Sequence, residues 1–355
     1  MKAISFAAPI PTYLATLLAG KLSDALYVGP HACTRLADVE TPALPTDRWV
    51  RVRTRMGGIC GSDLNIITLK ASPSTSPFSS FPFVIGHENV GEIVEVGRAV
   101  RDARVGDRVV ANPLLCCEPR ALEPPCDACM AGHHSRCARF TDGSIAPGML
   151  IGTTHGLGGS WGEMFVAHET QVVRVGDSVT DEEAVLVEPF ACSVHAVRSA
   201  MPASGERVLV IGAGSIGLLT VAALKAIAPG CHVTVLARHA FQSEHAIRLG
   251  ADGVVFARGD YLGQLAEGRH LAGLHELLVA TPDLRQLMQR RSTASEARTI
   301  APWICWFSST IRSRKRLTAT NQELTARCIS GVSQRPSMLC NVSVVDRPIA
   351  CSCSA

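Results

Sequence analysis

Hydrophobic and polar positions alternate along several short segments in the first half of the chain. Residues 49–54, Trp-Val-Arg-Val-Arg-Thr, show the period of two that is typical of a half-buried strand. Short strands separated by glycine-containing turns predict a small barrel or sandwich-like domain. Four further strands are predicted between glycine and Gly-Asp turns, over residues 91–100, 107–111, 162–167 and 171–175.

The pattern changes to helical spacing near residue 181. Residues 180–183, Thr-Asp-Glu-Glu, resemble a helix-capping start, and residues 184–200 have helical spacing that Pro189 interrupts. The alternation of strands and helices that follows predicts the parallel, doubly wound sheet of a nucleotide-binding domain. Its elements are predicted as strands over residues 207–211 and 231–236 and helices over residues 218–227 and 241–249.

This change divides the chain into three predicted parts. Residues 1–180 form the β-rich domain, and residues 181–273 form the Rossmann-type domain of an α/β protein. In residues 274–355 the pattern is lost: they contain one of the 30 glycines and have 11 basic and 5 acidic residues. Their five cysteines have no ligand spacing: Cys305, Cys328, Cys340, Cys351 and Cys353.

A doubly wound sheet normally continues with buried strands and glycine turns, so the Rossmann sheet is predicted to be incomplete. Two explanations of residues 274–355 remain open. A loss of the reading frame near residues 260–280 accounts for the abrupt change in composition better than a divergent or disordered tail does.

Two apolar stretches resemble targeting or membrane segments. In residues 1–27, Pro9 and Pro11 interrupt the stretch, which favours a first strand and a loop over a signal peptide. Residues 208–224 are uncharged, but glycines at nucleotide-binding spacing favour a buried strand followed by a buried helix. We therefore expect a cytoplasmic protein without membrane spans.

Composition narrows the class of protein further. A length of 355 residues predicts two domains, and 47% hydrophobic with 18% charged residues is typical of a globular chain. The net charge of +3, without a basic run, does not indicate a nucleic-acid partner. Fourteen cysteines, some at Cys-x-x-Cys spacing in a chain of this length, indicate metal binding rather than a disulfide scaffold.

Cys60 and the pair His87–Glu88 form a candidate catalytic metal site. Thiolate and imidazole are zinc ligands, and Glu88 either binds the metal or lies behind its ligands. Glu188 is a candidate third protein ligand, although a helix dipole also favours a carboxylate at that position. Each residue alone has an ordinary explanation, such as a buried apolar cysteine. Their combination favours catalytic zinc, which needs three protein groups and one open position.

A second group of cysteines predicts a closed structural zinc site. Cys126, Cys129 and Cys137 follow the spacing Cys-x2-Cys-x7-Cys in a loop rich in proline and glycine, after the pair Cys116–Cys117. Thiolates on one irregular lobe order a loop that lacks its own core. A disulfide arrangement fits a cytoplasmic protein poorly.

Residues 212–217, Gly-Ala-Gly-Ser-Ile-Gly, follow a predicted strand and open a predicted helix. The site comprises Gly212, Gly214, Ser215, Ile216 and Gly217. The glycines permit a tight turn and close approach of a pyrophosphate, which the helix N-terminus binds.

The end of the second strand selects the cofactor. It reads Val-Leu-Ala-Arg-His over residues 235–239, with alanine where an acidic residue would hold the ribose of NAD. Arginine at this position accommodates the 2′-phosphate of NADP, so Arg238 predicts NADP rather than NAD. An exposed Arg238 beside an adaptable NAD site is the alternative.

Taken together, these motifs resemble those of the zinc-dependent medium-chain alcohol dehydrogenases. The resemblance rests on Gly58–Asp63 (Gly-Ile-Cys-Gly-Ser-Asp), Gly86–Glu88, the spaced cysteines and the Gly212–Gly217 fingerprint, and it covers roughly residues 1–260. In that family a GroES-like barrel precedes a Rossmann fold. The resemblance therefore implies reversible oxidation of an alcohol to an aldehyde or ketone with NAD(P).

The resemblance also implies specific ligands. Catalytic zinc would bind Cys60, His87 and Glu188, with Glu88 behind these ligands or exchanging with them. An insertion over residues 118–125 lengthens the usual gap before the structural cysteines, where Cys117 aligns better than Cys116. Structural zinc would therefore bind Cys117, Cys126, Cys129 and Cys137.

The proton path and the biological role remain open. Ser62 resembles the hydroxyl of the family's proton relay, but Asn65 stands where some members have a relay histidine, and His195 is interpreted as a packing residue. The substrate is an unspecified small alcohol or carbonyl compound. The family implies a homo-oligomer, whose contacts would partly fall in residues 274–355. A non-catalytic or unstable zinc-binding relative is the alternative function.

Overall fold

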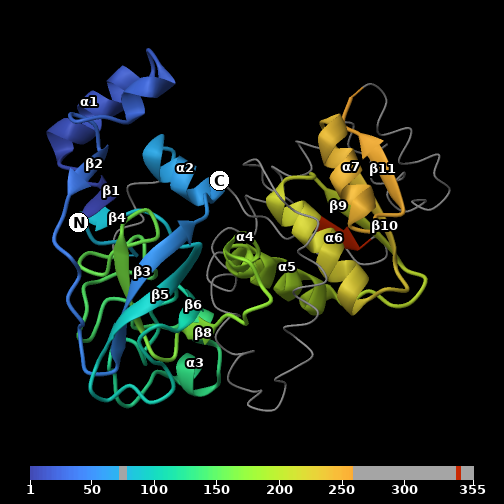
Figure 1. Cartoon of the computed structure of the whole chain (residues 1–355). Helices are drawn as coiled ribbons and strands as arrows, with labels where there is room; N and C mark the ends of the chain where they lie inside the picture. Colours follow the sequence, from blue (N-terminus) through green and yellow to red (C-terminus); the bar gives the residue numbers. More distant parts are fainter. Residues whose placement is uncertain (72–77, 259–340, 345–355) are drawn as a thin grey trace. The chain divides into compact units, whose positions relative to one another are not determined.

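The structure, a computed structural model, describes residues 1–71, 78–258 and 341–344 (Figure 1). Contacts divide these residues into two compact units, residues 1–188 and residues 189–258 with 341–344. The sequence predicts a domain boundary before Asp181, whereas the contacts divide the chain between Glu188 and Pro189. The domain bounds therefore stay a prediction. The predictions for residues 259–273 and for most of residues 274–355 lie outside the described residues.

The first unit is rich in antiparallel strands, which confirms the predicted β-rich domain. Its larger sheet has the strand order β7-β3-β5-β6-β8, and its smaller sheet has the order β2-β1-β4. The larger sheet contains β7 (Met164–His168), β3 (Trp49–Gly57), β5 (Asn89–Val96), β6 (Arg108–Ala111) and β8 (Val172–Arg174). The smaller sheet contains β2 (Thr34–Asp38), β1 (Lys2–Phe6) and β4 (Phe83–Val84).

The alternation along β3 explains how this strand packs. Val50 and Val52 are fully buried in a core with Ile93 and Phe165, as a two-residue period requires. The intervening Arg51 and Arg53 pair across the sheet with glutamates of β5, and the Arg53 Nη2–Glu92 Oε1 distance is 3.0 Å. One face of the strand therefore supports the core and the other supports cross-strand ion pairs.

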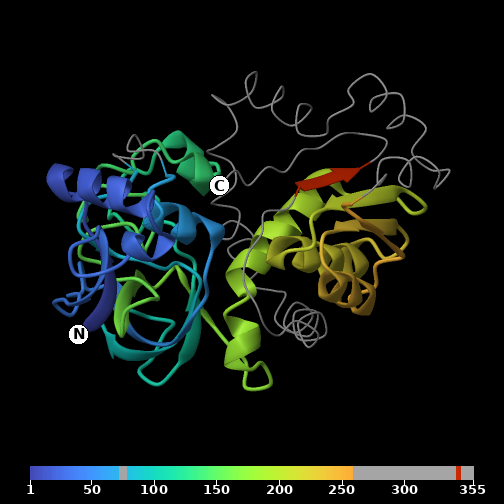
Figure 2. The ribbon, with the colours of Figure 1, turned by 90° about the horizontal axis from the view of Figure 1, so that it is seen from above.

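The segment after β1 is a helix, so the predicted loop is wrong there. α1 (Ile10–Gly20) begins directly after Pro9 and is followed by the 3-10 helix η1 (Asp24–Tyr27). Pro11 lies in the first helical turn, where the missing N–H costs no hydrogen bond. Proline therefore starts this helix instead of preventing it. Figures 1 and 2 show α1 at the periphery of the first unit.

Short helices complete the first unit. They are α2 (Gly61–Ile67), α3 (Asp127–Met130), the 3-10 helix η3 (His134–Arg136) and α4 (Asp181–Ala184). The predicted cap of α4 is confirmed: Thr180 Oγ1 accepts from the Glu183 N–H at 3.2 Å, and Glu183 Oε2 accepts from the Thr180 N–H at 2.8 Å.

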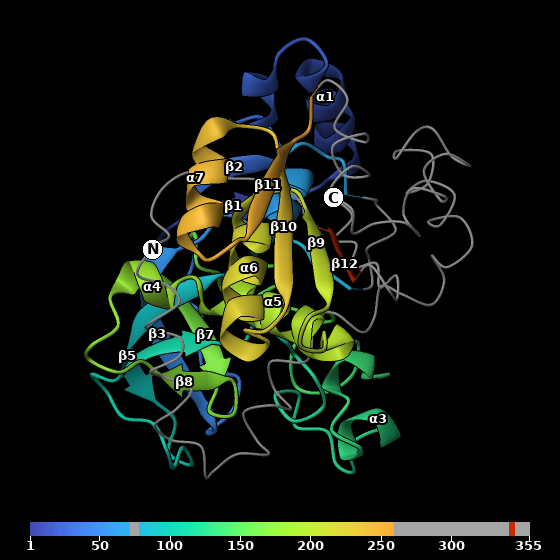
Figure 3. The ribbon, with the colours of Figure 1, turned by 90° about the vertical axis from the view of Figure 1, so that its right-hand side faces the viewer.

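The second unit has three parallel strands in the order β11-β10-β9 (Figure 3). α6 connects β9 to β10 and α7 connects β10 to β11, so the predicted strand–helix alternation is confirmed. The strands are β9 (Arg207–Ile211), β10 (His232–Ala237) and β11 (Gly253–Phe256), and the helices are α6 (Ser215–Ile227) and α7 (Ala240–Arg248). A further helix, α5 (Val187–Ala200), begins in the last two residues of the first unit and continues into the second. Pro189 lies in the first turn of α5 and does not interrupt it.

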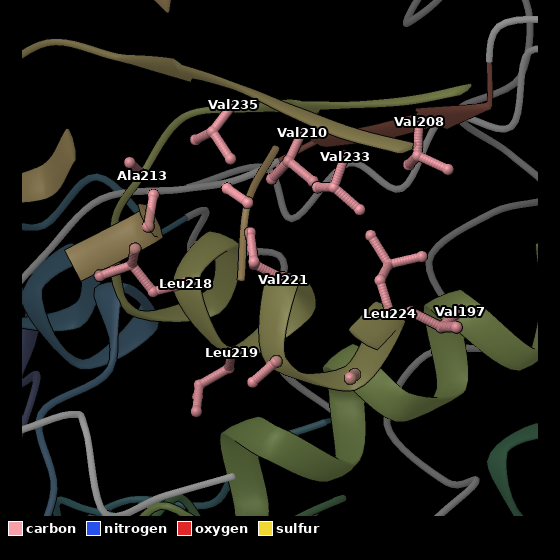
Figure 4. Close-up of a cluster of buried hydrophobic side chains, with 14 of the residues drawn as sticks. Val197, Val208, Val210, Ala213, Leu218, Leu219, Val221, Leu224, Val233 and Val235 are labelled. Atoms are coloured by element: carbon pink, nitrogen blue, oxygen red, sulfur yellow. The ribbon is translucent and has the colours of Figure 1, made fainter. Parts of the chain in front are cut away.

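The core of the second unit lies between its sheet and its helices. Figure 4 shows valines of β9 and β10 facing Val221 and Leu224 of α6, with Val197 of α5 beside them. A fourth strand, β12 (Asn341–Val344), pairs with β9 in the antiparallel direction. A doubly wound sheet places a parallel strand there. In the part of the chain that the structure describes, every helix is too short or too polar to span a lipid bilayer.

Candidate functional site

The structure brings Cys60, His87 and Glu88 together in the first unit. Cys60 is the N-cap residue of α2, whereas His87 and Glu88 lie in the short loop between β4 and β5. One ligand atom from each lies within 4.8 Å of the other two, and the two turn residues are buried. Thiolate, imidazole and carboxylate in this arrangement form a set of zinc ligands.

Asp63 orients two members of this group, and the sequence motifs did not single it out. Its side chain is buried at the third position of α2, where Oδ2 accepts a hydrogen bond of 2.9 Å from the Cys60 N–H. Oδ1 lies 3.3 Å from Nδ1 of His87. A carboxylate beside Nδ1 leaves Nε2 as the metal-binding nitrogen. The signal in the sequence was the acidic residue three positions after the N-cap.

Gly58 allows the Glu88 carboxylate to lie against the backbone before α2. The Gly58 N–H donates to the Glu88 carbonyl oxygen at 3.0 Å, and Trp161 Nε1 donates to the Gly58 carbonyl oxygen at 2.7 Å. A Cβ atom on Gly58 would lie 2.1 Å from Glu88 Oε2. Glycine is therefore required for the close approach of these two segments.

Asn89 fixes the turn that carries the other two ligands. This buried side chain donates from Nδ2 to the carbonyl oxygens of His87 and Ala111, both at 2.9 Å. Its Oδ1 accepts from the Ala111 N–H at 2.7 Å. The amide thus ties the start of β5 to the end of β6, which holds the backbone at His87 in place.

The electrostatics of this centre favour a bound cation. Burial, reinforced by the negative charge of Glu188, raises the pKa of Glu88 to about 7, and burial also raises the pKa of Glu188. For His87, burial alone would lower the pKa, but Asp63 and Cys60 together raise it well above its usual value. A divalent cation among these groups would offset the crowded negative charge, so the residues present fit a zinc ion.

Glu188 and Ser62, two further residues predicted for this site, are not members of the group formed by Cys60, His87 and Glu88. Glu188 is close enough to act on the charge of Glu88, but its ligand atoms are outside the group of three. Ser62 lies on α2, exposed to solvent, and Asn65 lies one turn further along the same helix. His195 lies on α5 in the second unit, where burial lowers its pKa.

The structure also brings four cysteines together around α3 and η3. The Sγ atoms of Cys117, Cys126, Cys129 and Cys137 all lie within 4.8 Å of one another. The Cys117 and Cys137 sulfurs are 3.6 Å apart, and the Cys126 N–H donates to Cys117 Sγ at 3.4 Å. Four such sulfurs are the ligand set of a closed structural zinc site. Cys116 is not in the group of four, although its thiol neighbours that of Cys129.

Arg120 is a second functional residue that sequence reasoning missed. It is fully buried beside the cysteine lobe, and burial lowers the pKa of its guanidinium to about 10. Its nitrogens donate to five carbonyl oxygens, those of Leu115, Asp142, Ile145, Ala146 and Gly148. The side chain therefore replaces missing backbone pairing in the irregular loop after Cys137.

In the second unit, the glycine fingerprint forms the turn between β9 and α6. Gly212 has a φ of 96°, which only glycine adopts readily, and its N–H donates to the Leu236 carbonyl oxygen at 2.9 Å. Gly214 is the N-cap of α6, Ser215 and Ile216 begin the helix, and Gly217 is buried. The first turn of α6 thus has the geometry of helix N-termini that can hold a pyrophosphate.

Arg238 directly follows β10 and is exposed. Gln242 Oε1 accepts from the N–H groups of Arg238 and His239 at 3.0 and 3.1 Å, which fixes the turn into α7. Arg238 therefore has a defined backbone position at the strand end where dinucleotide folds hold the ribose of the cofactor.

The chain has a β-rich domain with two groups of side chains of the types that bind metal, and a glycine turn on a parallel sheet follows. This combination is typical of proteins that bind both a metal and a dinucleotide. Residues 46–177 match the family model of the alcohol dehydrogenase GroES-like domain. The chain is 30% identical to the (R,R)-butanediol dehydrogenase of Bacillus subtilis over 280 residues, which cover 76% of this chain and 74% of the relative. The chain belongs to the zinc-dependent medium-chain alcohol dehydrogenase family.

Solved structures agree with this assignment. An Escherichia coli CFT073 alcohol dehydrogenase complexed with NADH is 28% identical, with a TM-score of 0.58 over 76% of this chain and 66% of that chain. A dehydrogenase of Sinorhizobium meliloti 1021 bound to NADP is 26% identical, with a TM-score of 0.52 over 64% of this chain and 60% of that chain. The chain spans only 52% to 59% of the length of the first three curated relatives it matches.

Proposed function

We propose that this chain is a zinc-dependent oxidoreductase that transfers a hydride between a small alcohol and NAD(P). The reaction would interconvert the alcohol with an aldehyde or ketone. The observation that carries the proposal is the convergence of Cys60, His87 and Glu88 within 4.8 Å. The Gly212–Gly217 turn adds the kind of site that holds a nicotinamide cofactor, which performs the hydride transfer, and zinc at the first group would activate the alcohol.

Each residue of the proposed metal centre has a separate role. Cys60 and His87 would hold the zinc, and Asp63 would keep Nε2 of His87 directed at it. Zinc, when bound, supplies a Lewis acid that makes a hydroxyl group more acidic. Ser62 would take up the proton and pass it to solvent, a role that its exposed position on α2 supports.

Glu88 and Glu188 compete for the role of third ligand. Family resemblance favours Glu188, whereas the group of ligand atoms contains Glu88. We propose that Glu188 binds the metal and that Glu88 exchanges with it. Glu188→Gln should then lower zinc affinity more than Glu88→Gln, which equilibrium dialysis against a zinc indicator measures. The opposite order would assign the ligand role to Glu88.

We further propose a structural zinc on Cys117, Cys126, Cys129 and Cys137, which gives two zinc ions per chain. We also propose a cytoplasmic location, because a reducing compartment keeps thiols free to bind metal. The nine cysteines of the described residues are all free thiols. Of these, only the Cys117, Cys126, Cys129 and Cys137 quartet has the ligand number of a closed site.

NADP is the proposed cofactor because Arg238 stands at the end of β10 and Ala237 replaces the acidic residue of NAD sites. Relatives of known structure include both an NADH and an NADP complex. Arg238→Asp should weaken NADPH binding at least tenfold and leave NADH binding unchanged or improved, as measured by fluorescence titration. An unchanged preference for the phosphate would count against the assignment.

The activity is tested with purified, zinc-loaded protein and a panel of small ketones, aldehydes and alcohols. NADPH oxidation or NADP reduction that disappears in Cys60→Ser would support the proposal. The Cys33→Ser variant, a buried thiol outside both metal groups, is the matched control and should retain activity.

A zinc-binding relative without catalysis is the second candidate. β12 beside β9 runs antiparallel where a doubly wound sheet has a parallel strand, so the second unit departs from a complete Rossmann sheet. Two bound zinc ions and no turnover across the panel would support this candidate. Turnover that depends on Cys60 would exclude it.

A further inference from the structure

Trp161 is hydrogen-bonded to both segments that carry the candidate ligands of the metal centre. Its Nε1 donates to the Gly58 carbonyl oxygen at 2.7 Å, and Cys60 lies two residues after Gly58. Its backbone N–H donates to the Ile85 carbonyl oxygen at 3.0 Å, and His87 lies two residues after Ile85. A single residue therefore connects the loop before α2 to the loop between β4 and β5.

The indole of Trp161 is itself held firmly. Its apolar body packs against a core that contains Phe6, Phe83 and Ile85. The Trp161 carbonyl oxygen accepts from the Ile4 N–H of β1 at 3.0 Å. An aromatic ring with a packed body and a hydrogen-bonded polar end has few positions open to it. The indole N–H is therefore a fixed point, against which the Gly58 carbonyl group is placed.

Gly86 makes room for the indole directly before His87. The Gly86 φ is 102°, and a Cβ atom there would lie 2.5 Å from Trp161 Cδ1 and 2.9 Å from the Trp161 backbone nitrogen. The Ser160 N–H donates to the Gly86 carbonyl oxygen at 2.9 Å. Glycine thus permits the ring and its backbone to lie against the chain at the point where the histidine ligand begins.

The peptide groups of Gly58 are held from two directions. The Gly58 N–H donates to the Glu88 carbonyl oxygen at 3.0 Å, and its carbonyl oxygen accepts from Trp161. Loss of the indole N–H would remove the second of these bonds and free the chain between Gly58 and Cys60. The bond of Asp63 to the Cys60 N–H would remain, but it ties Cys60 to its own helix and not to the loop of His87.

We propose that Trp161 is a positioning residue, which sets the separation of Cys60 and His87 and so strengthens zinc binding between them. This inference rests on the proposed function, because it requires zinc at the group that contains these two residues. Residues that orient metal ligands without touching the metal typically contribute about 10- to 100-fold to its affinity. Asp63 orients the ligand side chains of this centre, whereas Trp161 orients the two backbone segments that carry them.

Competition with a chelator, followed on the full, zinc-loaded chain, tests the proposal. Trp161→Phe keeps an aromatic ring in the core but removes the N–H. It should raise the zinc dissociation constant of this centre at least ~10-fold. Cys60→Ser identifies which zinc-release step belongs to the centre, because that step should be lost in this variant. The zinc proposed for the four cysteines should be released from Trp161→Phe as from the wild type.

Trp49→Phe is the matched control. Trp49 lies at the start of β3 and is fully buried, but its Nε1 has no hydrogen-bond partner among the described residues. The smaller ring should lower the free energy of unfolding through lost packing and leave zinc affinity unchanged. If Trp161 had only a structural role, zinc affinity would follow stability in both variants. Weaker zinc binding in Trp161→Phe alone therefore identifies positioning.

Hydrogen exchange of the indole N–H groups in the wild type gives a second measurement, which decides if Trp161→Phe does not fold. Because coupling between two equilibria is reciprocal, removal of zinc should speed exchange of the Trp161 indole N–H at least ~10-fold and leave that of Trp49 unchanged.

Two results would overturn the positioning role alone: equal zinc affinity of Trp161→Phe and the wild type, or indole exchange that does not respond to zinc. A wild type whose zinc release is the same as that of Cys60→Ser would show that the centre binds no zinc. That result would overturn the proposed function as well.

Discussion

At the scale of single residues, the two proposed metal centres depend on the side chains that orient the candidate ligands as well as on those ligands themselves. Asp63 holds the Cys60 backbone and faces Nδ1 of His87, so one carboxylate orients two donors. Arg120 plays the corresponding part in the cysteine lobe, where it bonds five carbonyl oxygens. A ligand without such support would lose side-chain and backbone order, and the metal affinity would fall.

The adjacent thiols Cys116 and Cys117 provide a first residue-scale prediction. Only Cys117 belongs to the group of four sulfurs, and its Sγ accepts from the Cys126 N–H. We therefore expect Cys117→Ser to lose one of two zinc ions and Cys116→Ser to keep both. Metal analysis of the dialysed proteins gives the stoichiometry. Loss of zinc from Cys116→Ser alone would transfer the ligand role to Cys116.

His168 provides a second prediction, because burial and the nearby charge of Arg48 lower its pKa to about 4. The unfolded value is about 6.5. A depressed folded pKa means that the unfolded state binds more protons between these values. The contribution of neutral His168 to the free energy of unfolding is therefore complete above pH ~6.5. It is lost as the pH falls towards 4, by up to ~3 kcal/mol.

Equilibrium unfolding at several pH values checks this dependence. Between pH ~6.5 and ~4 the free energy of unfolding of the wild type should fall more steeply than that of His168→Asn. His31→Asn removes an exposed histidine instead and should follow the wild-type curve. Parallel curves for the wild type and His168→Asn would contradict the assigned pKa.

At the scale of elements, the loop between β3 and α2 approaches Glu88 closely at Gly58, whereas Gly61, the first residue of α2, lies in open space. A Cβ atom on Gly58 would lie 2.1 Å from Glu88 Oε2 and 2.8 Å from its Cβ, whereas a Cβ atom on Gly61 would meet nothing within 4 Å. We expect Gly58→Ala to displace Glu88 and to weaken zinc binding at this centre at least tenfold.

Gly61→Ala is the matched control in the same motif. It should keep full zinc affinity and stabilise α2 by ~0.5–1 kcal/mol, because alanine loses less backbone freedom in a helix. Zinc titrations and thermal unfolding of both variants give the comparison. Equal zinc affinity for Gly58→Ala and the wild type would show that Glu88 can move aside without effect.

The elements also show what the sequence could predict. The strand over residues 207–211 and the cap at Thr180 followed from apolar runs and capping chemistry, which are local. α1 was missed because Pro9 and Pro11 normally break regular structure, and only at a helix start does proline fit. Arg120 was missed for a different reason: its carbonyl partners are brought to it by the fold and leave no motif in the sequence. Asp63 left a local capping signal, but its contact with His87 depends on the fold.

The same distinction applies to the ligand sets. Spacing predicted that Cys126, Cys129 and Cys137 lie together, since a short loop brings them within reach. Spacing did not determine the relation of Glu88 and Glu188 to the metal, because Glu188 lies a hundred residues further along the chain. Its distance from His87 depends on how the whole first unit folds.

At the scale of the whole molecule, the residues proposed to bind zinc and those proposed to bind the dinucleotide belong to different compact units. Both metal-binding groups lie within residues 1–188, whereas the glycine turn and Arg238 lie within residues 189–258. A ligand that binds only the folded state stabilises the unit to which it binds, by ~2.7 kcal/mol at a hundred times its dissociation constant. Zinc and dinucleotide should therefore protect different parts of the chain.

Amide hydrogen exchange read segment by segment measures this separation. Removal of zinc with a chelator should speed exchange in α3 and β6, and added NADPH should slow exchange in β9 and α6. Arg238→Asp should abolish the effect of NADPH and leave the effect of zinc removal unchanged, because the two sites lie in separate units. If zinc removal speeds exchange equally in β9 and α6, the stability of the second unit depends on the metal centres, and the two units unfold as one.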